Sequence, residues 1–212
     1  MYRLSPSDKA LIAQAGDVLG STFVDDPAWV WTFPDPEVRV KAVDFLERRV
    51  LHAHVPFGHC WATMDAEGRR VLAAAAWCPP RRQLGMLAFI RHGLAQVPFI
   101  VGVEAFRRMM HAEGTMRAIR REYSPGSSSW FLHTLGVARD AQGRGLGSDS
   151  LSAVLRDVVD PSGLQATVFT SRPVNLRFYR RAGFEVLHEE RVGCENGFSF
   201  WYMARPVPEK GR

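Results

Sequence analysis

A glycine-rich loop is the first part of this sequence whose residue types and spacing suggest chemistry. Its residues are Gln142, Gly143, Arg144, Gly145, Leu146 and Gly147, followed directly by Ser148. An apolar run at 130–137 precedes the loop, and apolar positions 151, 154, 155, 158 and 159 follow it with the period of an α-helix. A strand, a glycine loop and a helix start in this order present backbone N–H groups to an anion. We therefore expect a phosphate-binding loop here.

Spacing distinguishes this loop from two other glycine-rich phosphate sites. The dinucleotide-binding pattern GxGxxG would need glycine at position 148, where Ser148 stands. The phosphate loop of ATPases would need a Lys-Ser/Thr pair after its last glycine, and none follows Gly147. A purely structural turn is the remaining alternative, but three alternating glycines with Arg144 at a strand-to-helix junction favour an anion site.

Two further places carry candidate functional residues. Pro173 and Gly183 suit the first turn and the end of a short helix, which would place Asn175 and Tyr179 one turn apart on one face. Such a pair, taken alone, is more often a capping residue and a core aromatic. In the apolar run, alternation places His133 on the strand face of Leu135 and Val137. His133 is therefore a candidate base, although a lone strand histidine is usually a packed structural residue.

These motifs resemble those of the GNAT superfamily of N-acetyltransferases. Leu135, Gly136 and Val137, followed by the loop at 142–147, resemble its motif A, Q/R-x-x-G-x-G/A, and residues 175–184 resemble its closing helix-to-strand motif. The resemblance implies acetyl-coenzyme A as co-substrate, with its pyrophosphate at 142–148 and its pantetheine arm beside Leu135, Gly136, Val137 and Asn175. It also implies that Tyr179 points its hydroxyl at the cofactor sulfur. No metal is implied.

Two branches of that superfamily sharpen the comparison. Residues 130–137, 142–148 and 175–179 resemble the puromycin N-acetyltransferases. Those enzymes carry an acidic residue where Phe169 stands, so their substrate cannot be assigned to this protein from the resemblance. Residues 131–137 are similar to a motif of the serotonin N-acetyltransferases in which the histidine matching His133 helps to deprotonate the amine. The puromycin branch has no histidine at that position.

The activity that this resemblance implies is transfer of an acetyl group to a primary amine by direct attack on the thioester. An alkylammonium has a pKa of about 10.4 and must lose a proton first. His133 is the first candidate to accept it, and Glu104, Glu122 or a solvent chain are alternatives. The backbone N–H of Val137 would stabilise the oxyanion, and Tyr179 would protonate the departing thiolate.

Length and composition fit one α/β domain over residues 1–212. Of the 212 residues 46% are hydrophobic and 23% charged. We expect a mixed, mostly antiparallel sheet of six or seven strands flanked by helices, with the cofactor core at 130–184. Cys60, Cys78 and Cys194 are widely spaced, which favours buried free thiols over disulfides or a metal knuckle. No signal peptide or membrane span is evident, so we expect a cytoplasmic protein.

Residues 84–121 are expected to form two helices, divided near Pro98, that cover the acceptor site with a methionine-rich wall. Residues 81–121 carry eight arginines against two glutamates, within a chain of net charge +5. These arginines could face solvent or an acidic substrate. We expect a small-molecule amine as partner, with no nucleic acid or membrane, and the family resemblance is compatible with a homodimer. The alternatives are another acyl-CoA as donor, a non-catalytic CoA-binding protein, or a basic module that binds nucleic acid or protein.

Overall fold

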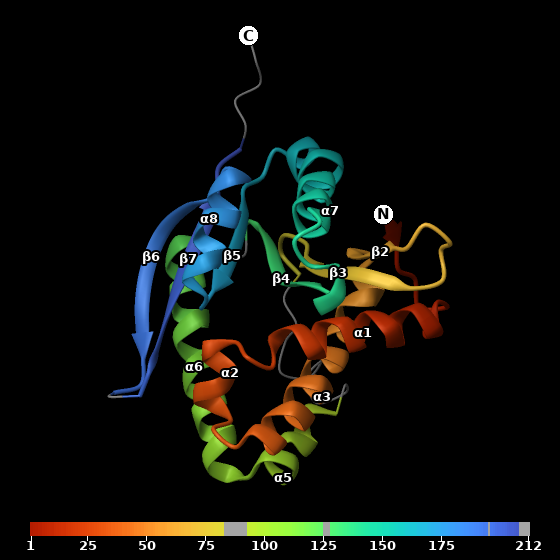
Figure 1. Ribbon diagram of the computed structural model, residues 1–212. Helices are drawn as coiled ribbons and strands as arrows, with labels where there is room; N and C mark the ends of the chain where they lie inside the picture. Colours follow the sequence, from red (N-terminus) through yellow and green to blue (C-terminus); the bar gives the residue numbers. More distant parts are fainter. Residues whose placement is uncertain (83–92, 125–127, 195, 208–212) are drawn as a thin grey trace.

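One mixed sheet of seven strands runs through the middle of the molecule (Figure 1). The computed structural model describes residues 1–82, 93–124, 128–194 and 196–207. The strand order is β1-β2-β3-β4-β5-β7-β6, and within the described residues β4 and β5 are the parallel pair while the other neighbours run antiparallel. The strands are β1 (Tyr2–Arg3), β2 (Cys60–Met64), β3 (Val71–Cys78), β4 (Trp130–Val137), β5 (Ala166–Thr170), β6 (Glu185–Val192) and β7 (Phe198–Arg205).

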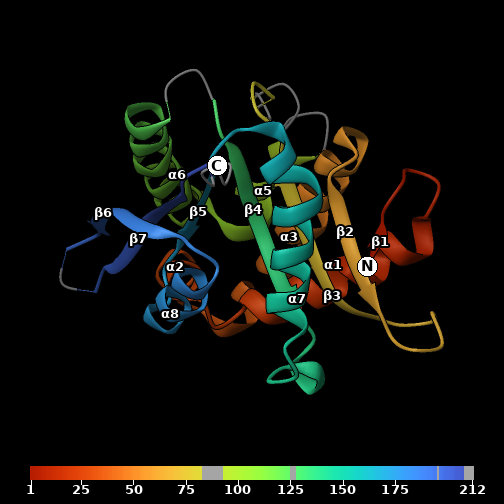
Figure 2. The ribbon, with the colours of Figure 1, turned by 90° about the horizontal axis from the view of Figure 1, so that it is seen from above.

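Helices cover both faces of this sheet (Figures 1 and 2). On one face α7 (Leu146–Val154) and α8 (Pro173–Arg181) pack against β3, β4, β5 and β7, and a π-helical turn at Leu155–Val159 extends α7. On the other face lie α1 (Lys9–Phe23), α3 (Pro36–His54) and α6 (Val103–Tyr123). Two short helices, α2 (Pro27–Thr32) and α5 (Val97–Val101), lie beside α3 and α6.

Local sequence explains where α2 and α3 begin. Asp26 and Asp35 are the N-cap residues of the two helices, and each is followed by a proline at the first helical position. The carboxylate of Asp26 accepts a hydrogen bond from Ala28 N at 3.0 Å, and that of Asp35 from Glu37 N at 2.8 Å. The start of α3 is therefore fixed by its own sequence.

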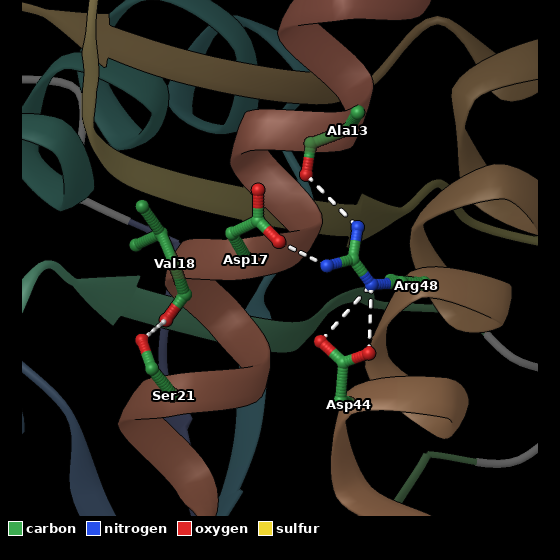
Figure 3. Close-up of polar contacts among 6 residues, drawn as sticks. All are labelled: Ala13, Asp17, Val18, Ser21, Asp44 and Arg48. Atoms are coloured by element: carbon green, nitrogen blue, oxygen red, sulfur yellow. Dashed lines mark hydrogen bonds and ion pairs between the residues drawn. The ribbon is translucent and has the colours of Figure 1, made fainter. Parts of the chain in front are cut away.

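Close packing of α1 against α3 fixes the position of α3 over the sheet. An added Cβ at Gly16 would lie 2.8 Å from Arg48 Cγ, and one at Gly20 would lie 3.0 Å from Asp44 Cα, so glycine permits this approach. Arg48 of α3 binds the carboxylate of Asp44 at 2.9 Å, the carboxylate of Asp17 on α1 and the carbonyl of Ala13 at 3.3 Å (Figure 3). The pair of helices therefore forms one unit.

Most of the expected elements are confirmed, including the helix after Asp8, the turn at 65–68, and the helix that ends before Gly183. Three expectations were wrong or incomplete. The helix α2 was not anticipated, and the helical region breaks at Gly102, which has φ +80°, whereas Pro98 lies in the first turn of α5. Cys60 and Cys78 are buried free thiols, but Cys194 is exposed. The expected helix over residues 84–92 lies outside the described residues.

None of the described helices is long and apolar enough to cross a membrane.

Candidate active site

The parallel strands β4 and β5 separate after a short contact. They pair at Trp130, Phe131 and Leu132 of β4, opposite Ala166, Thr167 and Val168 of β5. Of the remaining residues of β4, Thr134, Leu135, Gly136 and Val137 pair with β3 alone among the described strands. The sheet therefore opens at its centre, beside the carboxyl half of β4.

A β-bulge lies at the point where the strands separate. Trp77 of β3 pairs with Leu132, and Ala76 pairs with Thr134, so His133 is an extra residue on β4. The bulge breaks the alternation that the sequence suggested. His133 lies near Phe131 and His54, with ring centroids 5.7 and 4.7 Å away, whereas Leu135 packs with the α7 and α8 cluster on the opposite face. The expectation that His133 shares a face with Leu135 and Val137 was therefore wrong.

A cavity of about 420 Å³ passes through this opening. On the face of α3 and α6, side chains of Glu47, His133 and Arg120 line it. On the face of α8, its walls include Leu135, Asn175 and Tyr179, and these residues belong to or border the cluster around α7. The cavity therefore connects the two faces of the sheet, so that ligands approaching from opposite faces can meet in it.

The glycine loop lies at the start of α7 and is open on its outer side. Gly143 and Gly145 have φ values of +77° and +82°, which only glycine adopts readily, and Gly145 is the N-cap of α7. An added Cβ at Gly143 would meet no described atom within 4 Å, and one at Gly145 would meet only Asp149 Oδ2, at 3.8 Å. Arg144 and Ser148 are also exposed. The loop therefore offers unobstructed N–H groups at the positive end of the helix dipole, which fits a pyrophosphate.

Gly147 has a different role from the other two loop glycines. It lies within the first turn of α7, where an added Cβ would be 3.3 Å from Val137 Cγ2 and 3.7 Å from the ring of Phe178. Leu146, next to it, packs against the cluster between α1 and the sheet. Gly147 thus allows α7 to approach β4 and α8 closely, which brings the helix start to the opening.

The last residue of β4 presents its peptide group to the opening. Ala138 N donates to Leu72 O at 2.8 Å, so the neighbouring peptide of Val137 faces away from β3, toward the gap. On that side the Val137 carbonyl accepts hydrogen bonds from Gln142 Nε2 and Thr22 Oγ1, both at 3.1 Å. The side chain of Gln142 therefore holds the loop against the strand end. An added Cβ at Gly136 would lie 3.1 Å from Leu19, so this strand end also packs closely on α1.

Asn175 and Tyr179 share one face of α8 and both line the cavity. Asn175 Nδ2 donates to Thr170 Oγ1 at 3.1 Å, which fixes the amide at the end of β5. Tyr179 is 6% exposed, and its ring contacts Phe178 and Phe184. Burial, followed by the charge of Asp26, raises the pKa of the Tyr179 hydroxyl above its ordinary 10.0, so it remains protonated at neutral pH.

Glu47 of α3 is the functional candidate that the sequence analysis missed. It is 7% exposed, lines the cavity, and accepts a hydrogen bond from Thr134 Oγ1 at 3.2 Å, next to the bulge. Burial raises the pKa of Glu47 to about 7, an effect opposed by the Thr134 hydrogen bond and reinforced by the charge of Asp26. A carboxylate with this pKa is suited to exchanging protons at neutral pH.

One sequence signal could have identified Glu47. On the amphipathic helix α3, Val43, Leu46, Leu51 and His54 are also buried, so Glu47 lies within the buried face. A carboxylate on a buried helix face is rarely found without a partner or a function. Asp26, the other buried carboxylate in the cavity wall, was likewise missed; it accepts a hydrogen bond from Ser171 Oγ.

The three residues that the sequence suggested as bases, His133, Glu104 and Glu122, differ in their position relative to the cavity. Although the His133 side chain is exposed in the cavity, the walls around it partly desolvate the ring; this desolvation, followed by the charges of His54 and Arg120, holds the pKa of His133 well below its ordinary 6.5. Glu104 lies near Arg107 and Arg108 at 3.5 and 3.3 Å. Neither Glu104 nor Glu122 is among the residues that line the cavity.

A mixed sheet that opens beside a glycine loop and a helix start defines an acyl-CoA-dependent transferase fold. The model of the acetyltransferase (GNAT) family matches residues 25–184, and the chain belongs to this family, whose members use acetyl-CoA as co-substrate.

Solved structures share the fold over almost the whole chain. One, from Corynebacterium glutamicum, is described as histone acetyltransferase HPA2 and related acetyltransferase; it is 18% identical, with a TM-score of 0.65 over 100% of this chain and 97% of that chain. A polyamine N-acetyltransferase from Drosophila melanogaster is 18% identical, with a TM-score of 0.63 over 97% and 98%. An agmatine N-acetyltransferase is 18% identical, with a TM-score of 0.61 over 93% and 95%.

Proposed function

We propose that the protein transfers the acetyl group of acetyl-CoA to a primary amine of a small molecule. The observation that carries this proposal is the cavity through the opened sheet, with the Glu47 carboxylate on one side and the Tyr179 hydroxyl on the other. The names of the structural neighbours that act on polyamine and agmatine support an amine acceptor.

Acetyl-CoA enters from the face of α7 and α8 in this proposal. Its pyrophosphate binds the backbone of residues 142–148, where two glycines have positive φ and the loop is open. The pantetheine arm follows Leu135, Gly136 and Val137 into the gap beside β5, near Asn175, and pairs with backbone groups that have no strand partner there. The thioester then lies in the cavity between the two faces.

Glu47 is our candidate for the group that removes the proton from the amine. A base accepts a proton more readily when its pKa is higher, and the pKa of Glu47 is raised to about 7 while that of His133 is held well below 6.5. His133 then lies beside the reacting amine as a neutral hydrogen-bonding group. This assignment replaces the expectation that His133 is the first candidate.

The remaining groups act on the donor. The free amine attacks the thioester carbonyl, and the N–H of Val137, which faces the gap, stabilises the negative oxygen that forms. The C–S bond breaks, and the CoA sulfur takes a proton from the Tyr179 hydroxyl, whose raised pKa keeps that proton available. The nitrogen loses two protons in all. The first passes to Glu47 before the attack and then to solvent, and the second leaves the tetrahedral intermediate and, relayed by solvent, restores the Tyr179 hydroxyl.

Release of free CoA from acetyl-CoA across a panel of primary amines tests the proposal. We expect release that depends on the amine, with a matching N-acetylated product identified by mass spectrometry. Binding of acetyl-CoA with no turnover of any amine would instead support a CoA-sensing protein. Faster turnover of a longer acyl-CoA on the same acceptor would replace acetyl-CoA as the donor.

Other expectations from the sequence are retained as proposals. These are the extent of the domain over residues 1–212, the similarity to the puromycin N-acetyltransferases, a cytoplasmic location and a homodimer. The alternative of a basic module that binds nucleic acid predicts an affinity that falls steeply with salt concentration. The position of Arg120, Arg117 and Arg121 in the cavity wall favours a small ligand for these three arginines.

A further inference from the structure

Arg120 on α6 is a partly buried cation. Burial lowers the pKa of its guanidinium, and the charge of Glu113, which lies beyond ion-pair distance, raises it. Its Cζ lies 3.9 Å from the centroid of the Phe131 ring, and it lines the cavity. Its Nε is buried and has no hydrogen-bond partner, and none of the described carboxylates forms an ion pair with it. A buried guanidinium without a counter-ion is costly, so a protein retains one mainly where a ligand supplies the anion.

The charge around Arg120 is positive on balance. Arg117 and Arg121, on the same helix, also line this end of the cavity, whereas Glu113 is the acidic residue of α6 that lines it. Glu113 forms no ion pair within 4.0 Å among the described residues. This end of the cavity therefore attracts an anion, while the other end holds the carboxylates of Glu47 and Asp26.

Strand β4 connects the two ends. Arg120 lies over Phe131, and Glu47 binds Thr134, three residues further along. Three residues of extended chain span about 10 Å, and somewhat less across the bulge at His133. After allowing about 3 Å for each polar contact, a ligand that joins the two ends needs roughly 4 Å between its charged groups.

We infer that the acceptor is an amino acid whose amine and carboxylate are separated by about two methylene groups. The amine faces Glu47 and the acetyl group, and the carboxylate forms a forked pair with the guanidinium of Arg120. The apolar chain between them lies along Phe131 and Phe169, whose ring centroids are 6.0 Å apart. The inference rests on the proposed acetyl transfer and names its substrate class.

Three amines of nearly equal length test this inference: β-alanine, propylamine and 1,3-diaminopropane. They end in a negative, a neutral and a positive group, respectively. We expect kcat/KM for β-alanine to exceed that for propylamine by about 10- to 100-fold, the range for one charge-assisted contact, and 1,3-diaminopropane to be the poorest. Shorter amino acids, such as glycine, should also be poor because they cannot reach both ends.

Arg120→Met tests whether this side chain causes the preference for the amino acid, because methionine removes the charge but keeps an apolar stem over Phe131. The ratio of kcat/KM for β-alanine to that for propylamine should fall to near one, through a higher KM for β-alanine, while the affinity for acetyl-CoA is unchanged. Arg107→Met is the matched control, since the Arg107 side chain is 80% exposed on the same helix and does not line the cavity. Arg120→Lys, which keeps the charge but loses the fork, should retain part of the preference and serves if the methionine variant does not fold.

The outcomes separate this inference from the proposed function. If the wild-type protein prefers propylamine or 1,3-diaminopropane, or if Arg120→Met keeps the preference for the acid, the inference is overturned and acetyl transfer stands. If none of the three amines releases CoA but another amine of the panel does, the inference alone is overturned. If acetyl-CoA binds but no amine of the whole panel releases CoA, both are overturned.

Discussion

One side of the cavity comes from a continuous segment of the sequence, and the other side comes from segments that are far apart in it. The donor side uses one nearly continuous segment, from β4 through the glycine loop and α7 to α8, residues 130–181. The acceptor side combines Asp26 before α2, Glu47 of α3, Arg120 of α6 and the bulge of β4. Local spacing therefore reveals the donor side, whereas the acceptor side exists only after distant segments pack together. Substitutions on the two sides should separate donor binding from acceptor chemistry.

The largest expected effect is on the donor side, from Gly145→Glu. The glutamate places a negative charge where phosphate meets the backbone. It also puts a non-glycine residue at φ +82°, which is strained. We expect the affinity for acetyl-CoA, measured by calorimetry, to fall by at least about 100-fold, several charge-assisted contacts being lost. Gly163→Glu is the control, because Gly163 has φ +67° and open space around it but lies in another turn. Equal affinity for both variants would mean that the pyrophosphate binds elsewhere.

Glu47→Gln should have the largest effect on the acceptor side. Loss of a general base typically costs about 10²–10⁴-fold in rate, so kcat should fall by that amount while acetyl-CoA affinity is retained. Glu37→Gln, an exposed change in the first turn of the same helix, should leave kcat unchanged.

The pH–rate profile distinguishes Glu47 from His133. Only ionised Glu47 accepts a proton, and its pKa is about 7, so kcat/KM should decrease as the pH falls through 7. His133→Ala should keep this limb, and Glu47→Gln should lose it. A limb well below pH 6.5 that disappears in His133→Ala would identify the histidine as the base.

Tyr179→Phe tests the point where the two sides meet. The thiolate is a fair leaving group even without protonation, so kcat should fall by about 10²-fold or somewhat less, near the lower end for general acids. The ring still packs against Phe178 and Phe184, so acetyl-CoA affinity should hardly change. Tyr123→Phe, on α6, is the control and should keep full turnover. Unchanged turnover in Tyr179→Phe, with chemistry rate-limiting, would leave Tyr179 as a core aromatic.

The smallest effect is expected in the methionine-rich wall. Met109 is 7% exposed and lines the cavity, whereas Met110 is 38% exposed and does not. Met109→Ala should raise the acceptor KM several-fold and lower the free energy of unfolding by about 2–5 kcal/mol. Met110→Ala should change the free energy of unfolding by less than about 0.5 kcal/mol. Steady-state kinetics measures the KM, and thermal melts measure the change in stability. A shift confined to acetyl-CoA affinity would show that this wall does not contact the acceptor.

The sequence predicted the elements whose signals are local. The strand at 130–137, the loop that follows and the helix of Asn175 and Tyr179 were all anticipated, because glycine, proline and apolar spacing determine them over a few residues. The bulge was not anticipated, because it depends on register with β3, which lies more than fifty residues earlier in the chain. For the same reason alternation placed His133 on the wrong face. Glu47 lies on the apolar face of α3, a signal that the sequence carries, but its contact with Thr134 forms only after α3 packs on the sheet.

The contact between α1 and α3 sets a dimension of the active site, although neither Gly16 nor Arg48 lines the cavity. α1 binds α3 through Arg48 on one side, and Thr22 at its other end binds the carbonyl of Val137. α1 thus acts as a spacer between the helix that carries Glu47 and the strand end that carries the Val137 amide. A bulkier residue at Gly16 would push α3 outward and lengthen the path of the amine proton, without altering either group. In the proposed mechanism, the thickness of this helix–helix contact would therefore influence the rate of acetyl transfer.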